Sequence, residues 1–221
     1  MNKDHKLGET SLIIAAGMQR SASTWLYNAA RAVLCSNPAI QENLSAGWVD
    51  DWDLLPHSRY CLIKTHTFEP TLVTRAQFLL YSYRDVRDVL ASMKRKFNFT
   101  PTVENVGKLI YQHSQWIEKA DFVMRYETML GEKEPIIAAL ADLFGIENVE
   151  PASINEQLNA LSYRSQGQKN PTYHNVNLYH QGHFTDGRHG SWVDTLDSSL
   201  VKQIEDKYRS WFDANDYPVE S

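Results

Sequence analysis

GMQRSAST, residues 17–24, is the stretch of this sequence that decides its fold. It follows a short continuous apolar run, Ser11 to Ala16 (SLIIAA), and it leads into helix-compatible residues from Thr24 to Leu34. An uninterrupted apolar run of this length is typical of a strand buried on both faces of a sheet. In the order strand, loop, helix, backbone N–H groups of the loop and the helix N-terminus point at one spot. The sequence therefore predicts an anion-binding loop, in the position of a nucleotide phosphate.

Similar patterns recur along the chain. Further buried strands are predicted at Tyr60 to Ile63, Phe78 to Tyr83 and Asp121 to Met124. Apolar residues with helical spacing predict helices around residues 86–97, 136–144 and 200–212. Buried strands that alternate with helices indicate an α/β protein. We expect a P-loop-like three-layer fold with a central parallel β-sheet flanked by helices.

Length and composition favour one domain over residues 1–221. The chain has 221 residues, of which 43% are hydrophobic and 11% aromatic, which is enough for a substantial core. From Ser162 to Trp192 the sequence turns polar and irregular. A stretch of this length inside a compact domain is often functional, so we expect a lid over the site.

The charge balance argues against a nucleic-acid partner. The formal net charge is −5 and the pI is about 5.9, so no general polyanion-binding surface is expected. The apolar run from Leu12 to Met18 is too short to span a bilayer, and we expect neither a signal peptide nor association with a membrane.

Cysteine and histidine usage predicts neither disulfides nor a metal site. Cys35 and Cys61 are the only cysteines and form no CxxC pair, which favours a cytoplasmic location. The histidines between residues 174 and 189 lack a recognisable ligand spacing. We expect no bound metal, and the sequence does not indicate an oligomeric state.

The loop differs from the Walker A pattern GxxxxGK[ST] at two positions. Gly17 and Thr24 fit, but Ala22 stands where the second Gly is required, and Ser23 replaces the Lys that reaches the β- and γ-phosphates. Arg20 supplies the cation instead, and a guanidinium can bind a tetrahedral oxyanion through two hydrogen bonds. The alternative is a helix start whose Ser and Thr only cap.

Four motifs resemble those of sulfotransferases that use 3′-phosphoadenosine-5′-phosphosulfate (PAPS). RSASTWL (residues 20–26) resembles the 5′-phosphosulfate loop [KR]SG[ST]TW, with Ala22 in place of the usual Gly. YRDVRDVLAS (residues 83–92) resembles the 3′-phosphate motif RxxRDVxxS. CLIKTH (residues 61–66) resembles the strand-end KTH of the cytosolic branch, and RYE (residues 125–127) resembles the later YE element. In order and spacing the chain is similar to a small, bacterial-like member of that family.

The resemblance implies a site for PAPS. Adenosine 3′,5′-bisphosphate (PAP) is the product that is left after PAPS has given up its sulfuryl group. The C-terminal RKGxxGDW element of the family stands here as TDGRHGSW (residues 185–192), so Arg188 is expected to substitute for the missing cations. The donor-binding residues implied in this way are Arg20, Ser21, Ala22, Ser23, Thr24, Trp25, Arg84, Ser92, Tyr126 and Arg188.

Catalytic roles fall to Arg20, Lys64 and His66. Sulfuryl transfer asks the protein to align the acceptor with the S–O bond and to stabilise charge on the bridging oxygen, which suits Arg20 and Lys64. The acceptor must lose a proton, and a histidine that titrates near neutrality suits the role of general base, so His66 is expected to act as base. The predicted reaction is in-line transfer to a hydroxyl or amine of a small acceptor.

Two other functions remain open. One is a small-molecule kinase with a degenerate P-loop, which would need ATP and Mg²⁺; the missing Walker lysine argues against it. The other is a non-catalytic module that binds PAP, against which Lys64 and His66 argue. The acceptor itself is not identified: Trp48 and Trp52, with the aspartates at positions 50, 51 and 53, form either a polar loop or an aromatic, acidic acceptor-binding cluster.

Overall fold

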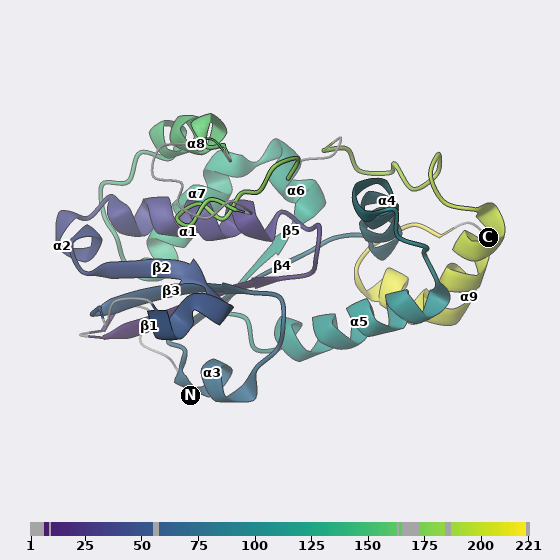
Figure 1. Ribbon diagram of the computed structural model, residues 1–221, viewed down its shortest axis with the longest axis horizontal. Helices are drawn as coiled ribbons and strands as arrows, with labels where there is room; N and C mark the ends of the chain where they lie inside the picture. The colour runs from purple at the N-terminus through teal and green to yellow at the C-terminus, as the bar shows by residue number, and fades with distance from the viewer. Residues whose placement is uncertain are drawn as a thin grey trace.

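The computed structural model describes residues 7–8, 10–54, 58–162, 164, 173–183 and 187–219. Figure 1 shows the arrangement of the helices and strands. In chain order they are β1 (Ser11–Gly17), α1 (Ser23–Cys35), α2 (Pro38–Gln41), β2 (Leu44–Trp48), the 3₁₀-helix η1 (Val49–Leu54), β3 (Tyr60–Thr65), α3 (Pro70–Arg75), β4 (Phe78–Tyr83), α4 (Val86–Phe97), α5 (Val103–Ile117), β5 (Phe122–Arg125), α6 (Tyr126–Gly131), α7 (Lys133–Phe144), α8 (Pro151–Ala160) and α9 (Ser198–Ala214).

Among the described residues, five parallel strands form one sheet in the order β2-β3-β1-β4-β5. The register pairs Trp48 with Lys64 and Gly17 with Ser82, so neighbouring strands end at a common edge. Ligands of open α/β sheets bind beyond this carboxyl edge, where the chain crosses from one side of the first strand to the other. The predicted parallel sheet is confirmed, and its carboxyl edge is where a site is expected.

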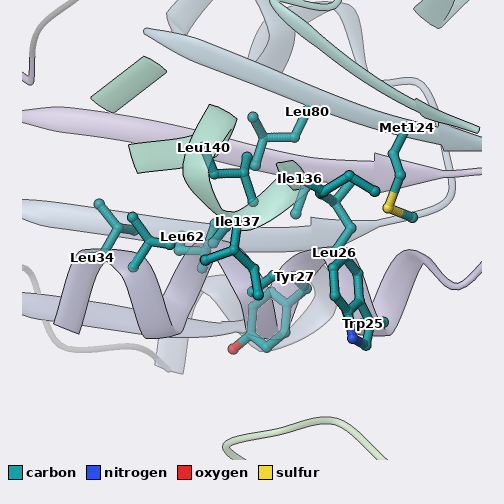
Figure 2. Close-up of a cluster of buried hydrophobic side chains, with 14 of the residues drawn as sticks. Trp25, Leu26, Tyr27, Leu34, Leu62, Leu80, Met124, Ile136, Ile137 and Leu140 are labelled. Carbon is teal, nitrogen blue, oxygen red and sulfur yellow. The ribbon is translucent and has the colours of Figure 1, made fainter. Parts of the chain in front are cut away.

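Helices cover both faces of the sheet (Figure 1). Helices α1, α7 and α8 pack on one face, and Figure 2 shows side chains of α1 and α7 against Leu62 and Leu80 of the sheet. On the other face, Leu72 and Val73 of α3 and Trp116 of α5 pack against β1 and β4. The apolar runs of β1 and β4 are explained by this double coverage, because each strand buries both of its faces.

A second apolar cluster joins α4, α5 and α9 beyond the carboxyl end of β4 (Figure 1). Arg87 lies at its centre, 1% exposed, with its guanidinium 4.2 Å from the ring centre of Trp192. It pairs with Asp85 at 2.7 Å and with Glu205 of α9. A buried arginine with two carboxylates joins α4 to α9, and we assign it a structural part.

The strand predictions were accurate to one or two residues at each end, but β2 was missed. Its sequence LSAGW contains Ser45, Ala46 and Gly47, residues of low strand propensity. Among the described residues, strand β2 is an edge strand that pairs only with β3, so it needs no continuous apolar run. Its last residue, Trp48, nevertheless reaches the functional edge of the sheet.

Candidate nucleotide-binding and catalytic site

The loop after β1 is closed tightly onto β4. A Cβ added to Gly17 would clash with Ser82 Oγ and Ser23 Cβ, so the position requires glycine because these two side chains approach its Cα closely. The Ser21 hydroxyl is fully buried and bonds to Met18 O at 2.6 Å and to Ser82 Oγ at 2.7 Å. Ser21 therefore holds the loop closed with a hydroxyl that faces inward.

Two residues of the loop adopt the left-handed conformation. Arg20 has φ 63° and Ala22 has φ 61° and ψ 27°, and Ala22 is the N-cap of α1 without a side-chain cap. The first backbone N–H groups of a helix have no partner within the helix, and together with the dipole they favour an anion. The predicted phosphate-type geometry is thus present at the start of α1.

We expect Ala22→Gly to raise the free energy of unfolding by about 0.5–1 kcal/mol. Glycine adopts the left-handed conformation without the steric penalty of a Cβ atom. The greater conformational entropy of glycine in the unfolded chain offsets only part of this stabilisation. The measurement is equilibrium unfolding in urea, with the two proteins compared at the same slope of the free energy of unfolding against urea concentration. Ala32→Gly, the same change at a regular position of α1, is the control and should lower stability by about 1 kcal/mol. A loss of stability in Ala22→Gly would contradict the assigned backbone conformation.

One cavity of about 580 Å³ lies at the carboxyl edge of the sheet. Its volume is in the range of small-molecule and cofactor sites. Of the residues that the sequence predicted, it is lined by Arg20, Ala22, Ser23, Thr24, Trp25, Lys64, His66, Arg84, Ser92 and Tyr126. Segments far apart in the chain therefore meet at a single site.

Lys64 and His66 form a hydrogen-bonded pair at the end of β3. His66 Nδ1 lies 2.6 Å from Gly17 O, and because a carbonyl only accepts, Nδ1 must carry the proton. Nε2 is then the basic nitrogen, and it accepts from Lys64 Nζ at 3.2 Å. Burial, and then the Lys64 charge, lower the pKa of His66 to about 3. This lies below the near-neutral titration expected from the sequence, and the ring is neutral at neutral pH.

Arg20 and Arg84 form a concentrated positive region on the other side of the loop. Arg20 Nε donates to Ser92 Oγ at 2.9 Å, and burial together with the nearby Arg84 lowers the pKa of Arg20. Arg84 is 3% exposed; it donates to Arg20 O at 3.3 Å and stacks 4.0 Å from the ring centre of Tyr126. The buried guanidinium of Arg84 and the half-buried one of Arg20, beside a hydroxyl, make a site for an anion with several oxygens.

Two residues that line the cavity carry a buried nitrogen donor without a hydrogen-bond partner among the described residues: Arg84, through Nε, and Trp25, through Nε1. Buried donors are normally paired, so both nitrogens are exceptions in this structure.

Asp88 organises the loop that borders Arg84. Its carboxylate accepts from Gly190 N at 2.7 Å, from Ser191 Oγ at 3.0 Å and from Trp192 N at 3.1 Å, and it lies 3.5 Å from the Arg84 guanidinium. Asp88 is not among the donor-binding residues that the sequence implied. The Arg188 side chain is exposed and does not line the cavity; its backbone carbonyl accepts from Arg84 instead.

Residues 173–183, which we call the roof segment, cover the cavity. Asn28 Nδ2 donates to Asn177 O at 2.8 Å, and Arg20 Nη2 donates to His183 O at 3.1 Å. Tyr173 OH donates to Asp51 Oδ2 at 2.8 Å, which links the roof segment to η1. This described part of the predicted lid is anchored to three elements of the site; residues 163, 165–172 and 184–186 of the lid lie outside the described residues.

Several lining residues were not foreseen as members of the site. Phe97 and Leu130, 58% and 39% exposed, are two of them, and Lys133 of α7 is another. The roof segment contributes Tyr173, Leu178, Tyr179, His180 and His183, whereas Trp48 of β2, which also lines the cavity, belongs to the cluster that the sequence offered for the acceptor. No local motif marks these residues, because their common position depends on long-range packing.

Comparison with solved structures identifies the fold. Mouse sulfotransferase SULT7A1 complexed with PAP superimposes with a TM-score of 0.64 over 93% of this chain and 85% of that chain, at 15% sequence identity. Retinol dehydratase in a complex with retinol and PAP gives 0.56 over 99% and 85%, and its complex with androsterone and inactive cofactor PAP gives 0.55 over 99% and 84%, both at 16% identity. The chain therefore has an α/β fold of the kind found in sulfotransferases.

No protein-family model matches the sequence, and no curated protein is significantly similar to it. Among the described residues, no helix is long and apolar enough to cross a membrane, and no three histidine, cysteine or acidic residues are grouped as a metal site would require. At the identities found, the likeness to solved structures establishes the fold alone.

Proposed function

We propose that this protein is a sulfotransferase that moves a sulfuryl group from PAPS to a hydroxyl or amine of a small acceptor. The observation that carries the proposal is the meeting of Arg20, Lys64 and His66 with Arg84 and Ser92 in one cavity. A kinase of the P-loop type needs its loop lysine, whereas this loop offers an arginine. A pure binding module would have no need of a buried lysine and histidine beside the loop.

The donor fits the residues that are present. Arg84 and Ser92 would hold the 3′-phosphate, Trp25 and Tyr126 would contact the adenine end, and the loop N–H groups with Ser23 and Thr24 would hold the 5′-phosphosulfate. Ser21 would contribute through its backbone, since its hydroxyl is bonded within the loop. We retain Arg188 among the donor-binding residues through its carbonyl, which orients Arg84.

PAPS supplies a sulfuryl group, whose bond to the bridging oxygen breaks as the acceptor oxygen or nitrogen bonds to sulfur. In this proposal His66 Nε2 takes the acceptor proton, because Nδ1 already donates to Gly17 O and keeps the ring in the required tautomer. Lys64 must first leave Nε2, and the sulfonate oxygens offer its ammonium a negatively charged partner. Arg20 and Lys64 then stabilise the charge that develops at the bridging oxygen.

Calorimetry without added metal tests the donor class. PAP should bind about 10²-fold more tightly than 5′-AMP, because the 3′-phosphate adds charge-assisted hydrogen bonds to buried arginine. An acceptor screen with PAPS should then detect transfer. Binding of ATP only with Mg²⁺ would favour the kinase, and tight PAP binding without transfer to any acceptor would favour the binding module.

A further inference from the structure

Trp48 lies beside both side chains at the end of β3. Its ring centre is 4.7 Å from Lys64 Nζ and 5.6 Å from the centre of the His66 ring. The strand register pairs Trp48 directly with Lys64, so the contact follows from the sheet itself. One aromatic side chain therefore touches the ammonium and the imidazole that the transfer would use.

In the described part of the chain, the buried Lys64 ammonium has no negative partner. Lys64 is 3% exposed, and among the described residues no carboxylate forms an ion pair with it. Among the described residues, the charged or titratable groups that interact with Lys64 or with the histidines near it are Arg20, His66, Lys96, His180 and His183, none of which is anionic. Burial lowers the pKa of Lys64 to about 7, so its charged form depends on every stabilising contact.

The indole of Trp48 is the contact that can supply this stabilisation. A tryptophan face is the strongest aromatic partner for an ammonium, and the attraction grows when water is excluded. Trp48 Nε1 donates to Asp50 Oδ2 at 2.8 Å, which fixes the orientation of the ring. The neighbouring Asp51 accepts from Tyr173 OH, so the turn that carries this anchor is itself tied to the roof segment.

We propose that Trp48 is a positioning residue, whose indole face holds the protonated Lys64 side chain within the cavity. The inference rests on the proposed function, in which Lys64 serves the sulfuryl donor. Under this proposal Trp48 contributes to the transfer step as well as lining the cavity.

The direct test is an NMR titration of Lys64 in nucleotide-free protein labelled with ¹³C-lysine, with the signal assigned through Lys64→Arg. In Trp48→Leu the midpoint of the Lys64 titration should fall by about one pH unit, because the cation–π contact is lost. In Trp48→Phe it should fall less, since a weaker aromatic face remains. Equal midpoints in wild type, Trp48→Phe and Trp48→Leu would overturn the proposal.

Steady-state kinetics distinguish a residue that positions Lys64 from one that only lines the cavity. With saturating PAPS and acceptor, Trp48→Leu should lower kcat about 10-fold and move the alkaline fall of kcat to lower pH, and Trp48→Phe should retain more of the wild-type kcat. A higher KM for the acceptor with unchanged kcat would mean that Trp48 only contacts the bound acceptor. The titration needs no turnover, so it decides the role of Trp48 even if the protein transfers no sulfuryl group.

Discussion

His66→Ala should lower kcat for sulfuryl transfer by at least about 10²-fold, because general-base assistance to the attacking acceptor is removed. Nε2 is the only ring nitrogen available for this task, since Nδ1 donates to Gly17 O at 2.6 Å. The measurement is initial-rate kinetics at saturating PAPS, beside calorimetric binding of PAP to the same variant. PAP affinity should stay close to that of the wild type.

His66→Asn is the matched variant for this experiment. Its side-chain amide can still donate to Gly17 O but offers no basic nitrogen, so the loop contact survives while the base is lost. We expect it to be as slow as His66→Ala. Wild-type turnover in either variant would remove His66 as the base, and recovery in the Asn variant alone would mean that His66 acts through the Gly17 contact.

Arg84→Ala should weaken PAP binding by about 10²-fold and leave binding of 5′-AMP nearly unchanged, because the lost charge-assisted hydrogen bonds are those to the 3′-phosphate. Arg84 is almost fully buried, its Nε has no partner among the described residues, and it stacks on Tyr126. Calorimetry with the two nucleotides measures the difference. An equal loss for both would refute the assignment of Arg84 to the 3′-phosphate.

Two further variants control this prediction. Arg84→Lys keeps a positive charge near Asp88, so the loop that Asp88 holds should remain folded in this variant. Arg188→Ala makes the same chemical change in a neighbouring arginine whose side chain is exposed and lines no part of the cavity. We expect a much smaller effect, since the Arg188 backbone carbonyl that receives Arg84 remains. A loss equal to that of Arg84→Ala would mean that the Arg188 side chain itself binds phosphate.

Much of the site could be predicted because its motifs occupy the ends of buried strands. The apolar runs before Gly17, Lys64 and Arg84 marked strands β1, β3 and β4 without any knowledge of the fold. Parallel strands bring their carboxyl ends to one edge, so the residues that follow them meet there. For this reason ten of the implied residues line one cavity.

Other features depended on contacts between distant segments. The sequence suggested Arg188 as the missing cation, whereas the structure brings its backbone carbonyl, and not its side chain, to Arg84. Asp88 was not among the residues that it implied, although the carboxylate holds residues 190–192 in place. It assigned Ser21 to the ligand, whereas the hydroxyl closes the loop against Ser82. Spacing along the chain does not tell which way such groups point.

By itself the sequence determined the order of buried strands and helices, the anion-binding loop and the motif residues, because apolar runs and helical periods are local properties of the chain. The tertiary structure decided which side chains share the cavity. Strand β2 carries a weak local signal, yet its pairing with β3 brings Trp48 to Lys64. Pairing and burial act between residues far apart in the chain, and only the packed fold determines them.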